Sequence, residues 1–321
     1  MKILLTGGLG YIGSHIANLL GKRAVIIDNQ VNSSLDYKKF LPEATYYNFD
    51  LNSKLIDQIF LDHKIEGVIH LAALKAVNES LKNPINYYKN NICSSINLLE
   101  TMKKYKVQKI VFSSSATVYG DKNESPLKEN MNLEAINPYG RTKIIIENLL
   151  KDYAKSEPNF KSIVLRYFNP IGADIKAGLL EQPLGKPQNI IPSIIKSIKE
   201  KKTFKIYGNN YKTKDGTCIR DYIHVKDLAV AHILALKKLK ILKNHNVINL
   251  GLGKGASVLE IVKLFEKINK IKVNYRITNR RKGDVAISYA DNKIAKKVLG
   301  WKPKYDHIEM VRDAWQSYLN K

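Results

Sequence analysis

A tyrosine and a lysine stand four residues apart in NPYGRTK, residues 137–143, just behind a proline. Positions i and i+4 of an α-helix share a face, so Tyr139 and Lys143 would point the same way. An ammonium group next to a phenol favours the phenolate, which can act as a base. An amphipathic helix with one lysine reaching toward solvent would give the same spacing. The pair alone therefore does not establish a catalytic site.

Three glycines near the N-terminus form a second pattern with chemical potential. Gly7, Gly10 and Gly13 lie in TGGLGYIGSH, between an apolar, β-prone run and a helical pattern. Glycine lets the backbone approach a pyrophosphate, and the following helix N-terminus offers N–H groups to the anion. Asp28 ends the next apolar run, where its carboxylate could accept hydrogen bonds from ribose hydroxyls and would repel a 2′-phosphate. The pattern predicts NAD rather than NADP; the alternative is a glycine turn without a ligand.

The elements that must position these residues alternate between β-prone runs and helical patterns. Buried strands separated by helices predict a parallel, doubly wound Rossmann-type sheet, which binds ligands outside the carboxyl ends of its strands. The expected strands are 2–6, 24–28, 45–49, 67–72, 109–114 and 162–168, and the expected helices between them are 11–21, 53–63, 84–105 and 139–155.

The alternation weakens after about residue 170. Glycine and proline crowd 170–192, which we interpret as a long loop that becomes ordered on binding. We expect a smaller mixed α/β lobe beyond it, so that 1–170 forms the dinucleotide domain, 221–236 packs back onto that domain, and 171–321 mainly forms a substrate lobe. Its expected elements are helices at 191–201, 257–269 and 306–319, a stretch at 221–236 and a strand at 247–251.

Composition argues against several other classes of protein. The chain has 321 residues, 44% of them hydrophobic, which is typical of a globular protein. No apolar run reaches the roughly 18 residues of a membrane span, and the N-terminal run is too short for a signal peptide. Cys93 and Cys218 make no disulfide framework, and the seven histidines show no metal-ligand spacing. We therefore expect a cytoplasmic enzyme without a metal or a membrane partner.

The net charge of +24 could indicate a nucleic-acid partner. Only eight of the 53 basic residues are arginine, however, and the lysines are scattered through every segment. Base readout favours arginine, and phosphate-tracking surfaces usually cluster their charge. We expect no nucleic-acid partner. The positive electrostatic field of the protein could instead attract a small anionic substrate.

Longer motifs resemble a known family. The spacing G-x-x-G-x-x-G, together with Tyr139 and Lys143, resembles the extended short-chain dehydrogenase/reductase superfamily. Within it, the UDP-glucose 4-epimerases, also called UDP-galactose 4-epimerases, are similar over essentially the whole chain. The motifs that carry this resemblance are HLAALKAVNES (70–80), FSSSATVYG (112–120), LRYFNPIGA (165–173), DGTCIRDYIHVKDLA (215–229), RRKGD (280–284) and LGW (299–301).

The resemblance implies that Tyr139 is the catalytic base, that Lys143 is its partner and that Ser115 relays the proton. A free tyrosine has a pKa near 10, so a base that works at pH 7 must lower that value by about 3, or roughly 4 kcal/mol. A lysine cation and a positive nicotinamide within several Å could supply this, since two unit charges 4 Å apart at an effective dielectric constant of 20 interact by about 4 kcal/mol.

The same resemblance implies a cofactor set and a substrate set. Arg220 and Arg281 would pair with the diphosphate, Tyr207 would pack near uracil, and Asp284 would hold the uridine ribose. The cofactor set is Gly7, Gly10, Tyr11, Ile12, Gly13, Asp28, Asn29, Asn32, Ser33, Asp50, Leu51, Leu71, Ala72, Ala73, Lys75, Asn91, Ser113, Tyr139, Lys143 and Phe168, and the substrate set is Ser115, Tyr139, Asn169, Asn189, Ile190, Tyr207, Arg220, Arg281, Asp284 and Ser288.

Local differences within the superfamily decide the expected reaction. Nucleotide-sugar dehydratases carry an Asp-Glu pair after the active-site Ser or Thr, and decarboxylating relatives keep a Glu there, whereas this chain has Ala116 and Thr117. A 4-keto sugar would then be reduced again on its other face, which is epimerisation. The alternatives are an epimerase of another nucleotide sugar, a pentose or uronic acid, or a non-catalytic sensor of NAD or a nucleotide sugar.

Two further expectations follow from the resemblance. Some members have a bulky tyrosine and others a small residue at the position of Ser288, so a serine should leave room for a 2-acetamido group and allow UDP-N-acetyl sugars as substrates. Family members also suggest a homodimer formed through helices 84–105 and 139–155.

Overall fold

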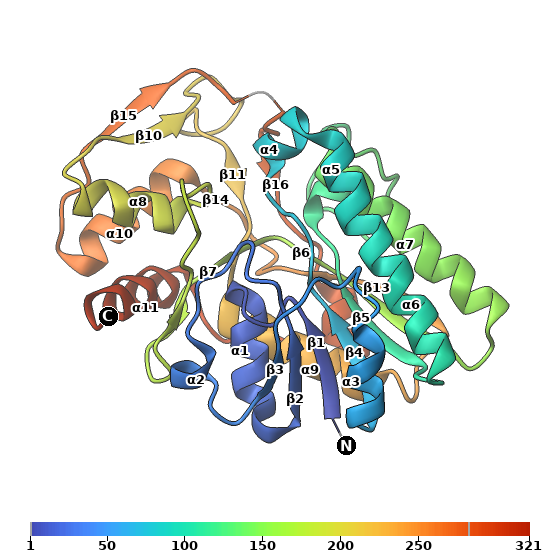
Figure 1. The fold of residues 1–321 in the computed structure, drawn as a ribbon. Coiled ribbons are helices and arrows are strands. Elements are labelled where there is room, and N and C mark those ends of the chain that lie inside the picture. Colours follow the sequence, from blue (N-terminus) through green and yellow to red (C-terminus); the bar gives the residue numbers. More distant parts are fainter. Residues whose placement is uncertain (1, 282) are drawn as a thin grey trace.

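The computed structural model describes residues 2–281 and 283–321 (Figure 1). A seven-stranded parallel sheet forms its centre, in the order β13-β6-β5-β4-β1-β2-β3. This is the strand order of a Rossmann-type fold extended by one strand, so the predicted fold class is confirmed. The strands are β1 Lys2–Thr6, β2 Ala24–Ile27, β3 Thr45–Tyr47, β4 Ile65–His70, β5 Lys109–Ser113, β6 Lys161–Tyr167 and β13 His245–Leu250.

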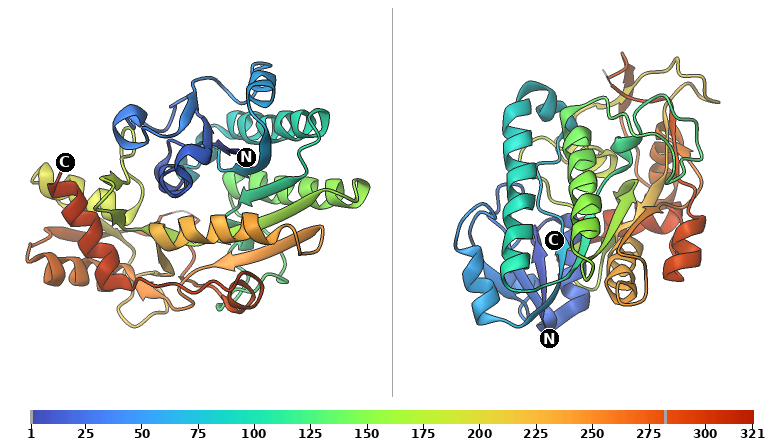
Figure 2. Two further views of the ribbon diagram at one scale, coloured as in Figure 1. Left: turned by 90° about the horizontal axis from the view of Figure 1, so that it is seen from below. Right: turned by 90° about the vertical axis from the view of Figure 1, so that its right-hand side faces the viewer.

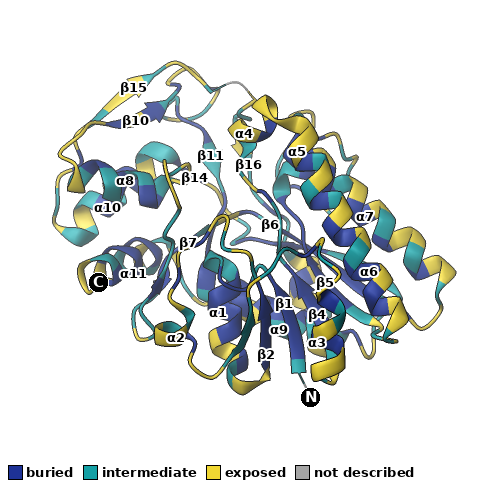
Figure 3. Cartoon of the chain, viewed as in Figure 1, coloured by how far each residue is buried: buried dark blue, intermediate teal, exposed yellow. Residues whose placement is uncertain are grey.

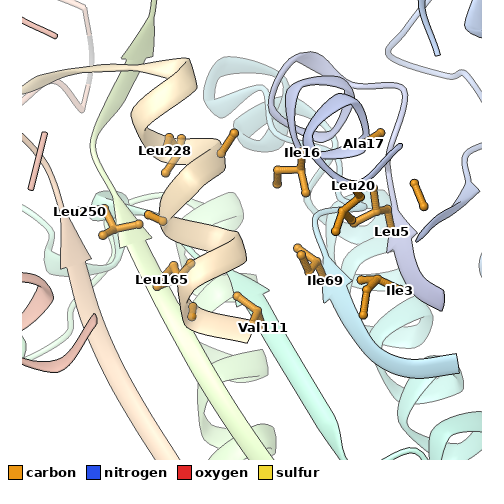
Figure 4. Close-up of a cluster of buried hydrophobic side chains, with 14 of the residues drawn as sticks. Ile3, Leu5, Ile16, Ala17, Leu20, Ile69, Val111, Leu165, Leu228 and Leu250 are labelled. Carbon is orange, nitrogen blue, oxygen red and sulfur yellow. The ribbon is translucent and has the colours of Figure 1, made fainter. Parts of the chain in front are cut away.

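The alternation of side chains along β1 explains why helices cover both faces of the sheet. Ile3 and Leu5 belong to one buried cluster, whereas Leu4 between them belongs to another. The first cluster packs α1 and α9 against the sheet, and Figure 4 shows their side chains meeting those of the strands. The second cluster packs α3, α6 and α7 on the other face. These helices are α1 Tyr11–Leu20, α3 Ile56–Asp62, α6 Ser94–Lys104, α7 Pro138–Ser156 and α9 Val225–Lys238.

The helices present exposed residues outward, while the strands between them are buried (Figure 3). A second view shows α6 and α7 running side by side on their face of the sheet (Figure 2). In the first turn of α7, Pro138 occupies an early position and the Asn137 side chain accepts a 2.8 Å hydrogen bond from Gly140 N. This start of α7 places Tyr139 in the first helical turn.

A smaller lobe has a core of its own, in which helices α8, α10 and α11 pack around β10. Ser257 and Asp306 start α10 and α11 with capping boxes, which satisfy backbone N–H groups at the helix ends. The remaining elements of the chain are α2 Tyr37–Phe40, α4 Val77–Lys82, α5 Pro84–Tyr88, α8 Ile190–Lys199, α10 Val258–Asn269, α11 His307–Leu319, β7 Asn169–Ile171, β8 Ala173–Asp174, β9 Leu179–Leu180, β10 Phe204–Tyr207, β11 Ile219–Arg220, β12 Tyr222–His224, β14 Ala256–Ser257, β15 Tyr275–Thr278 and β16 Ile287–Ser288.

The structure differs from the sequence-based expectation in several elements. The expected helix 84–105 is α5, a π-helical turn at Lys89–Cys93 and α6. The stretch 221–236 begins as a strand, β12, before α9 starts, and the segment 170–192 contains β8, β9 and most of β7 rather than only a loop. The strand expected within the smaller lobe, β13, pairs with β6 and completes the main sheet. These differences depend on contacts with segments that are distant in the sequence.

Candidate active site

A cavity of about 330 Å³ opens at the carboxyl edge of the main sheet, between the sheet and the smaller lobe. Its walls come mainly from the turns after β1, β2, β3, β4, β5 and β6, from the start of α7, and from the segment after β9. The residues predicted from the sequence that line it are Gly7, Gly10, Tyr11, Ile12, Gly13, Asp28, Asn29, Asn32, Ser33, Asp50, Leu51, Leu71, Ala72, Ala73, Lys75, Ser115, Tyr139, Lys143, Phe168, Asn169 and Asn189.

The glycine turn between β1 and α1 approaches the loop after β4 so closely that side chains are excluded. Gly7 has φ +72°, and a Cβ on it would lie 2.8 Å from Ala72 N. A Cβ on Gly13 would meet the Gly7 carbonyl and lie 2.7 Å from Gly8 Cα. Gly10 differs, because the nearest protein atom to its Cβ would be 3.3 Å away. That contact, with the Gly7 carbonyl oxygen, is tight but needs a shift of only a few tenths of an ångström, and Gly10 also lines the cavity.

Asp28, at the end of β2, holds the glycine turn and lines the cavity. Its carboxylate accepts hydrogen bonds from Leu9 N at 3.0 Å and from Gln30 N at 2.8 Å. Burial raises the pKa of Asp28 above its ordinary value, and these backbone donors act in the opposite direction. The Ser33 hydroxyl donates to the Leu9 carbonyl at 2.5 Å, which ties the next loop to the same turn.

Ser115, Tyr139 and Lys143 share one wall of the cavity and are almost fully buried. Lys143 Nζ donates a 2.8 Å hydrogen bond to the Ser113 carbonyl at the end of β5. The same nitrogen lies 4.7 Å from the ring centre of Phe112 and 5.8 Å from that of Tyr139. Helix α7 and the end of β5 thus bring together three side chains that stand 28 positions apart at most.

Burial dominates the acid–base properties of this wall. It raises the pKa of Tyr139 to about 12, while a hydrogen bond with Ser115 acts in the opposite direction. It also lowers the pKa of Lys143 to about 7, opposed by the charge of Glu147. In the protein alone, the pKa of Tyr139 lies above that of free tyrosine. The decrease in the pKa of Tyr139 that was expected from the sequence therefore requires more positive charge than the protein alone places near the phenol.

Lys75 and Glu181 reach toward each other across the cavity, from the loop after β4 and the segment after β9. Lys75 Nζ lies 3.7 Å from Glu181 Oε1, which also accepts a 2.6 Å hydrogen bond from Asn189 Nδ2. Burial raises the pKa of Glu181, and Lys75 acts in the opposite direction. Sequence reasoning missed Glu181, because a single glutamate in a loop carries no periodicity or motif.

Five residues predicted for substrate binding gather in the smaller lobe, outside the lining of the cavity. Arg220 Nη2 lies 3.6 Å from Asp284 Oδ1, and the Arg281 guanidinium lies 4.0 Å from the ring centre of Tyr207. Ser288 in β16 is opposite Arg220 in β11. Ile190, the first residue of α8, likewise does not line the cavity.

Asn91 and Ser113, predicted as cofactor contacts, lie behind the cavity rather than in its wall. Asn91 binds the backbone of Leu74, accepting from its N at 2.8 Å and donating to its carbonyl at 3.1 Å. The Ser113 hydroxyl lies 2.8 Å from His232 Nε2. Both residues support the wall, because they fix segments that do reach the cavity.

Several lining residues escaped sequence reasoning. Thr117 had entered it only as a residue that is not acidic, yet its hydroxyl donates a 3.0 Å hydrogen bond to Ser115 Oγ. The others are mostly apolar or loop residues without a motif, and loop packing alone brings them to the cavity. They are Leu9, Ser14, Ile27, Val31, Leu35, Phe49, Leu74, Val77, Asn90, Ser94, Tyr167, Pro170, Leu180, Glu181, Gln182 and Pro183.

Within 2–281 and 283–321, no three His, Cys, Asp or Glu side chains gather as ligands for a metal ion. In the same part of the chain, no helix is both long and apolar enough to cross a membrane.

The fold and the site define a class of protein. A glycine turn on a Rossmann sheet, an acidic residue ending β2 and a buried Tyr–Lys pair on α7 fit NAD and the oxidation of an alcohol. The profile of the NAD dependent epimerase/dehydratase family matches residues 3–251, and the chain belongs to that family.

Within it, the chain belongs to the UDP-glucose 4-epimerases and is an NAD-dependent isomerase that interconverts UDP-glucose and UDP-galactose. It is 46% identical to the UDP-glucose 4-epimerase of Dictyostelium discoideum, covering 98% of this chain and 95% of that one. A structure of the Bifidobacterium longum enzyme in complex with NAD⁺ and UDP is 40% identical, with a TM-score of 0.94 over 100% of this chain and 99% of that chain. A structure of the UDP-Glc/GlcNAc 4-epimerase of Campylobacter jejuni is 34% identical, with a TM-score of 0.84 over 100% and 99%.

Proposed function

We propose that Ser115, Tyr139 and Lys143 carry out the proton transfers of this epimerisation at C4 of the sugar. The observation that supports this most is the convergence of the three side chains on the cavity that the glycine turn also lines. Tyr139 accepts the proton of the C4 hydroxyl, Ser115 relays it, and Lys143 supplies positive charge next to the phenol. NAD, when bound, supplies a hydride acceptor that carries a positive charge of its own.

The cofactor is held by the chain segments at the carboxyl edge of the sheet. The turn at Gly7–Gly13 takes the pyrophosphate against the N-terminus of α1. Asp28 binds the adenosine ribose. Its carboxylate selects NAD over NADP because it would repel a 2′-phosphate. Lys75 reaches the nicotinamide half, which requires it to exchange its contact with Glu181 for one with the cofactor.

The smaller lobe holds the nucleotide in place while the sugar rotates in the pocket. Arg220 and Arg281 bind the diphosphate, because planar guanidinium groups match pairs of phosphate oxygens. Tyr207 packs on uracil and Asp284 binds the uridine ribose. Asn169, Asn189 and Ile190 approach the same substrate from the cleft side, the first two as part of the cavity wall. This arrangement makes residues 1–170 mainly the NAD domain and 171–321 mainly the UDP-sugar lobe, with β13 and α9 returning to the former.

The residues after Ser115 favour epimerisation over elimination. Ala116 cannot act as an acid or base. Thr117 has no carboxyl group either, and its hydroxyl donates a hydrogen bond to Ser115. Without an acid to expel a hydroxyl, the 4-keto sugar rotates in the pocket and is reduced on its other face. With NAD bound, the hydride removed from C4 would return to the same carbon, so the reaction would consume no reductant.

The substrate range extends to UDP-N-acetyl sugars. The support is the small side chain of Ser288, which lies beside Arg220 in the pairing of β11 and β16. A serine takes up less space beside Arg220 of the proposed clamp than a tyrosine would. The test is NMR of the purified protein with UDP-galactose and, in a separate sample, UDP-N-acetylgalactosamine, without added NAD. Formation of both gluco epimers is expected; conversion of neither, even with NAD, contradicts the proposal.

The protein is a homodimer in the cytoplasm, with helices 84–105 and 139–155 at the interface. Apolar side chains exposed on these helices support the interface, among them Ile85 on α5, Ile96 on α6 and Ile145 on α7. Light scattering coupled to gel filtration measures the mass directly. A mass of about twice 36.5 kDa is expected, and a shift to the monomer in Ile85→Lys would assign the face.

A further inference from the structure

The end of β5 and one face of α7 are joined by two hydrogen bonds from successive residues. The Ser113 carbonyl accepts a hydrogen bond from Lys143, and the Ser114 hydroxyl donates one to Glu147, while Ser115 lines the cavity together with Tyr139. The helix residues recur every four positions, at 139, 143 and 147, so all three lie on one face of α7. Glu147 is the member of this row that does not reach the cavity.

Glu147 is buried together with Arg166, and the two form an ion pair. Each side chain is only 4% exposed, and Arg166 Nη2 lies 2.6 Å from Glu147 Oε2. Arg166 Nε contacts both carboxylate oxygens at 3.1 Å, so the pair has a forked geometry. Arg166 Nη1 donates to the Tyr119 hydroxyl and to the Glu129 carbonyl, each at 3.1 Å. A buried carboxylate with this many donors has one fixed position.

We propose that Glu147, fixed by Arg166, is a positioning residue for the epimerisation, because its charge keeps the buried Lys143 protonated and its contact with Ser114 anchors the strand end that carries Ser115. The inference rests on the roles proposed above for Ser115, Tyr139 and Lys143. Glu147 acts through these residues and touches neither the sugar nor the cofactor site.

The groups that face Lys143 show why a negative charge is needed there. From β4 comes His70, whose pKa burial lowers to about 3, so that it is neutral at pH 7. From β5 come the Phe112 ring and the Ser113 carbonyl, and from α7 itself come Tyr139 and Glu147. Glu147 is the carboxylate in this set. Burial lowers the pKa of Lys143 to about 7, and Glu147 opposes that decrease.

The test compares holoenzyme variants that lack the charge of Glu147, lack its hydrogen bond with Ser114, or keep both. Glu147→Gln/Arg166→Met removes both charges at once, because losing one partner alone would leave the other buried and unpaired. Ser114→Ala removes the anchor and keeps both charges. Glu157→Gln is the matched control: Glu157 caps the end of α7 and pairs with Lys103 at 2.7 Å on the surface. The readouts are thermal melting, and kcat and KM for UDP-galactose from pH 6 to 9.

The double variant should lose kcat at pH 8 by up to about 10-fold, since each unit by which the pKa of Lys143 falls divides its protonated fraction about tenfold at a pH above that pKa. KM should stay within about twofold, and the decline of kcat at high pH should move to lower pH, so that activity recovers toward pH 6. Ser114→Ala should lower kcat without moving that decline, and Glu157→Gln should match wild type.

Equal kcat in the folded double variant and wild type, or a loss that is the same at every pH, would overturn the proposal. So would Ser114→Ala moving the decline as far as the double variant does. If the double variant does not fold, Glu147→Gln and Glu147→Asp replace it, and the aspartate, which keeps the charge, should retain the wild-type pH profile. Tyr139→Phe is tested alongside: full activity there would contradict the proposed catalytic roles themselves, whatever the Glu147 variants show.

Discussion

Lys143 Nζ donates a 2.8 Å hydrogen bond to the Ser113 carbonyl, and this contact fixes α7 against the end of β5. It connects a helix residue to the strand that leads into Ser115, and so holds together two segments that form one wall of the cavity. The bond also leaves the ammonium group 5.8 Å from the ring centre of Tyr139. The lysine therefore has a structural partner in addition to its proposed electrostatic role.

Tyr139→Phe removes the proposed base and leaves the ring in place. We expect kcat to fall by about 10²–10⁴-fold, the usual contribution of a general base, with little change in bound NAD or melting temperature. NMR of UDP-galactose conversion measures the rate, and absorbance of the denatured supernatant measures NAD. Tyr153→Phe, on the same helix but away from the cavity, is the control. Wild-type activity in Tyr139→Phe would contradict the assignment.

Gly10→Ala and Gly13→Ala should separate cofactor binding from folding. A Cβ at Gly13 meets the backbone of Gly7 and Gly8, so this variant should be destabilised as well as poor in NAD. A Cβ at Gly10 has its nearest protein atom at 3.3 Å, and the residue lines the cavity. Gly10→Ala needs a shift of only a few tenths of an ångström, so it should be destabilised less than Gly13→Ala and yet bind NAD more weakly. Melting scans with and without NAD distinguish the two, and identical behaviour of both variants would count against this reading.

Buried histidines make the protein sensitive to acid. Burial lowers the pKa of His70 to about 3 and the pKa of His15 and His232 to about 4. Between those values and about 6.5 the unfolded chain binds protons that the folded protein does not, so stability is full above pH 6.5 and is lost as the pH falls. Each histidine contributes a slope of about 1.4 kcal/mol per pH unit in that window.

Urea unfolding between pH 7 and 4.5 measures this slope. His232 is suited to a variant because Nδ1 contacts the Leu228 carbonyl and Nε2 contacts the Ser113 hydroxyl, both at 2.8 Å, which satisfies the neutral ring. His232→Gln should reduce the slope, whatever its effect on stability at pH 7. A stability that is constant from pH 7 to 4.5 would show that the histidines are not neutral in the folded protein.

Ser288→Tyr should narrow the substrate range. The residue lies next to Arg220 in the β11–β16 pairing, so a tyrosine would occupy space beside the proposed UDP clamp. We expect loss of activity on UDP-N-acetylgalactosamine by at least about 10-fold, or about 1.4 kcal/mol of steric cost, and retention of activity on UDP-galactose. Ser288→Ala is the control and should keep both activities. Equal loss on both sugars would indicate general damage to the lobe rather than a size filter.

Much of this site was predictable from the sequence because its signals are local. Helical periodicity and turn residues within one βαβ unit or one helix are enough to predict three of its features. They are the glycine turn, Asp28 at the end of β2 and the spacing of Tyr139 and Lys143. Six strands of the main sheet were placed within two residues of their observed ends, since buried parallel strands form continuous β-branched runs.

Contacts between distant segments decided the rest. Only the folded chain shows β13 beside β6, Glu181 beside Lys75, and Asn91 and Ser113 behind the cavity wall instead of in it. The ion pair of Glu147 with Arg166 is likewise invisible in the sequence, where either residue could face solvent. A side chain's type and spacing fix what chemistry it can do, but its burial and partners, and therefore its pKa, depend on which strands become neighbours.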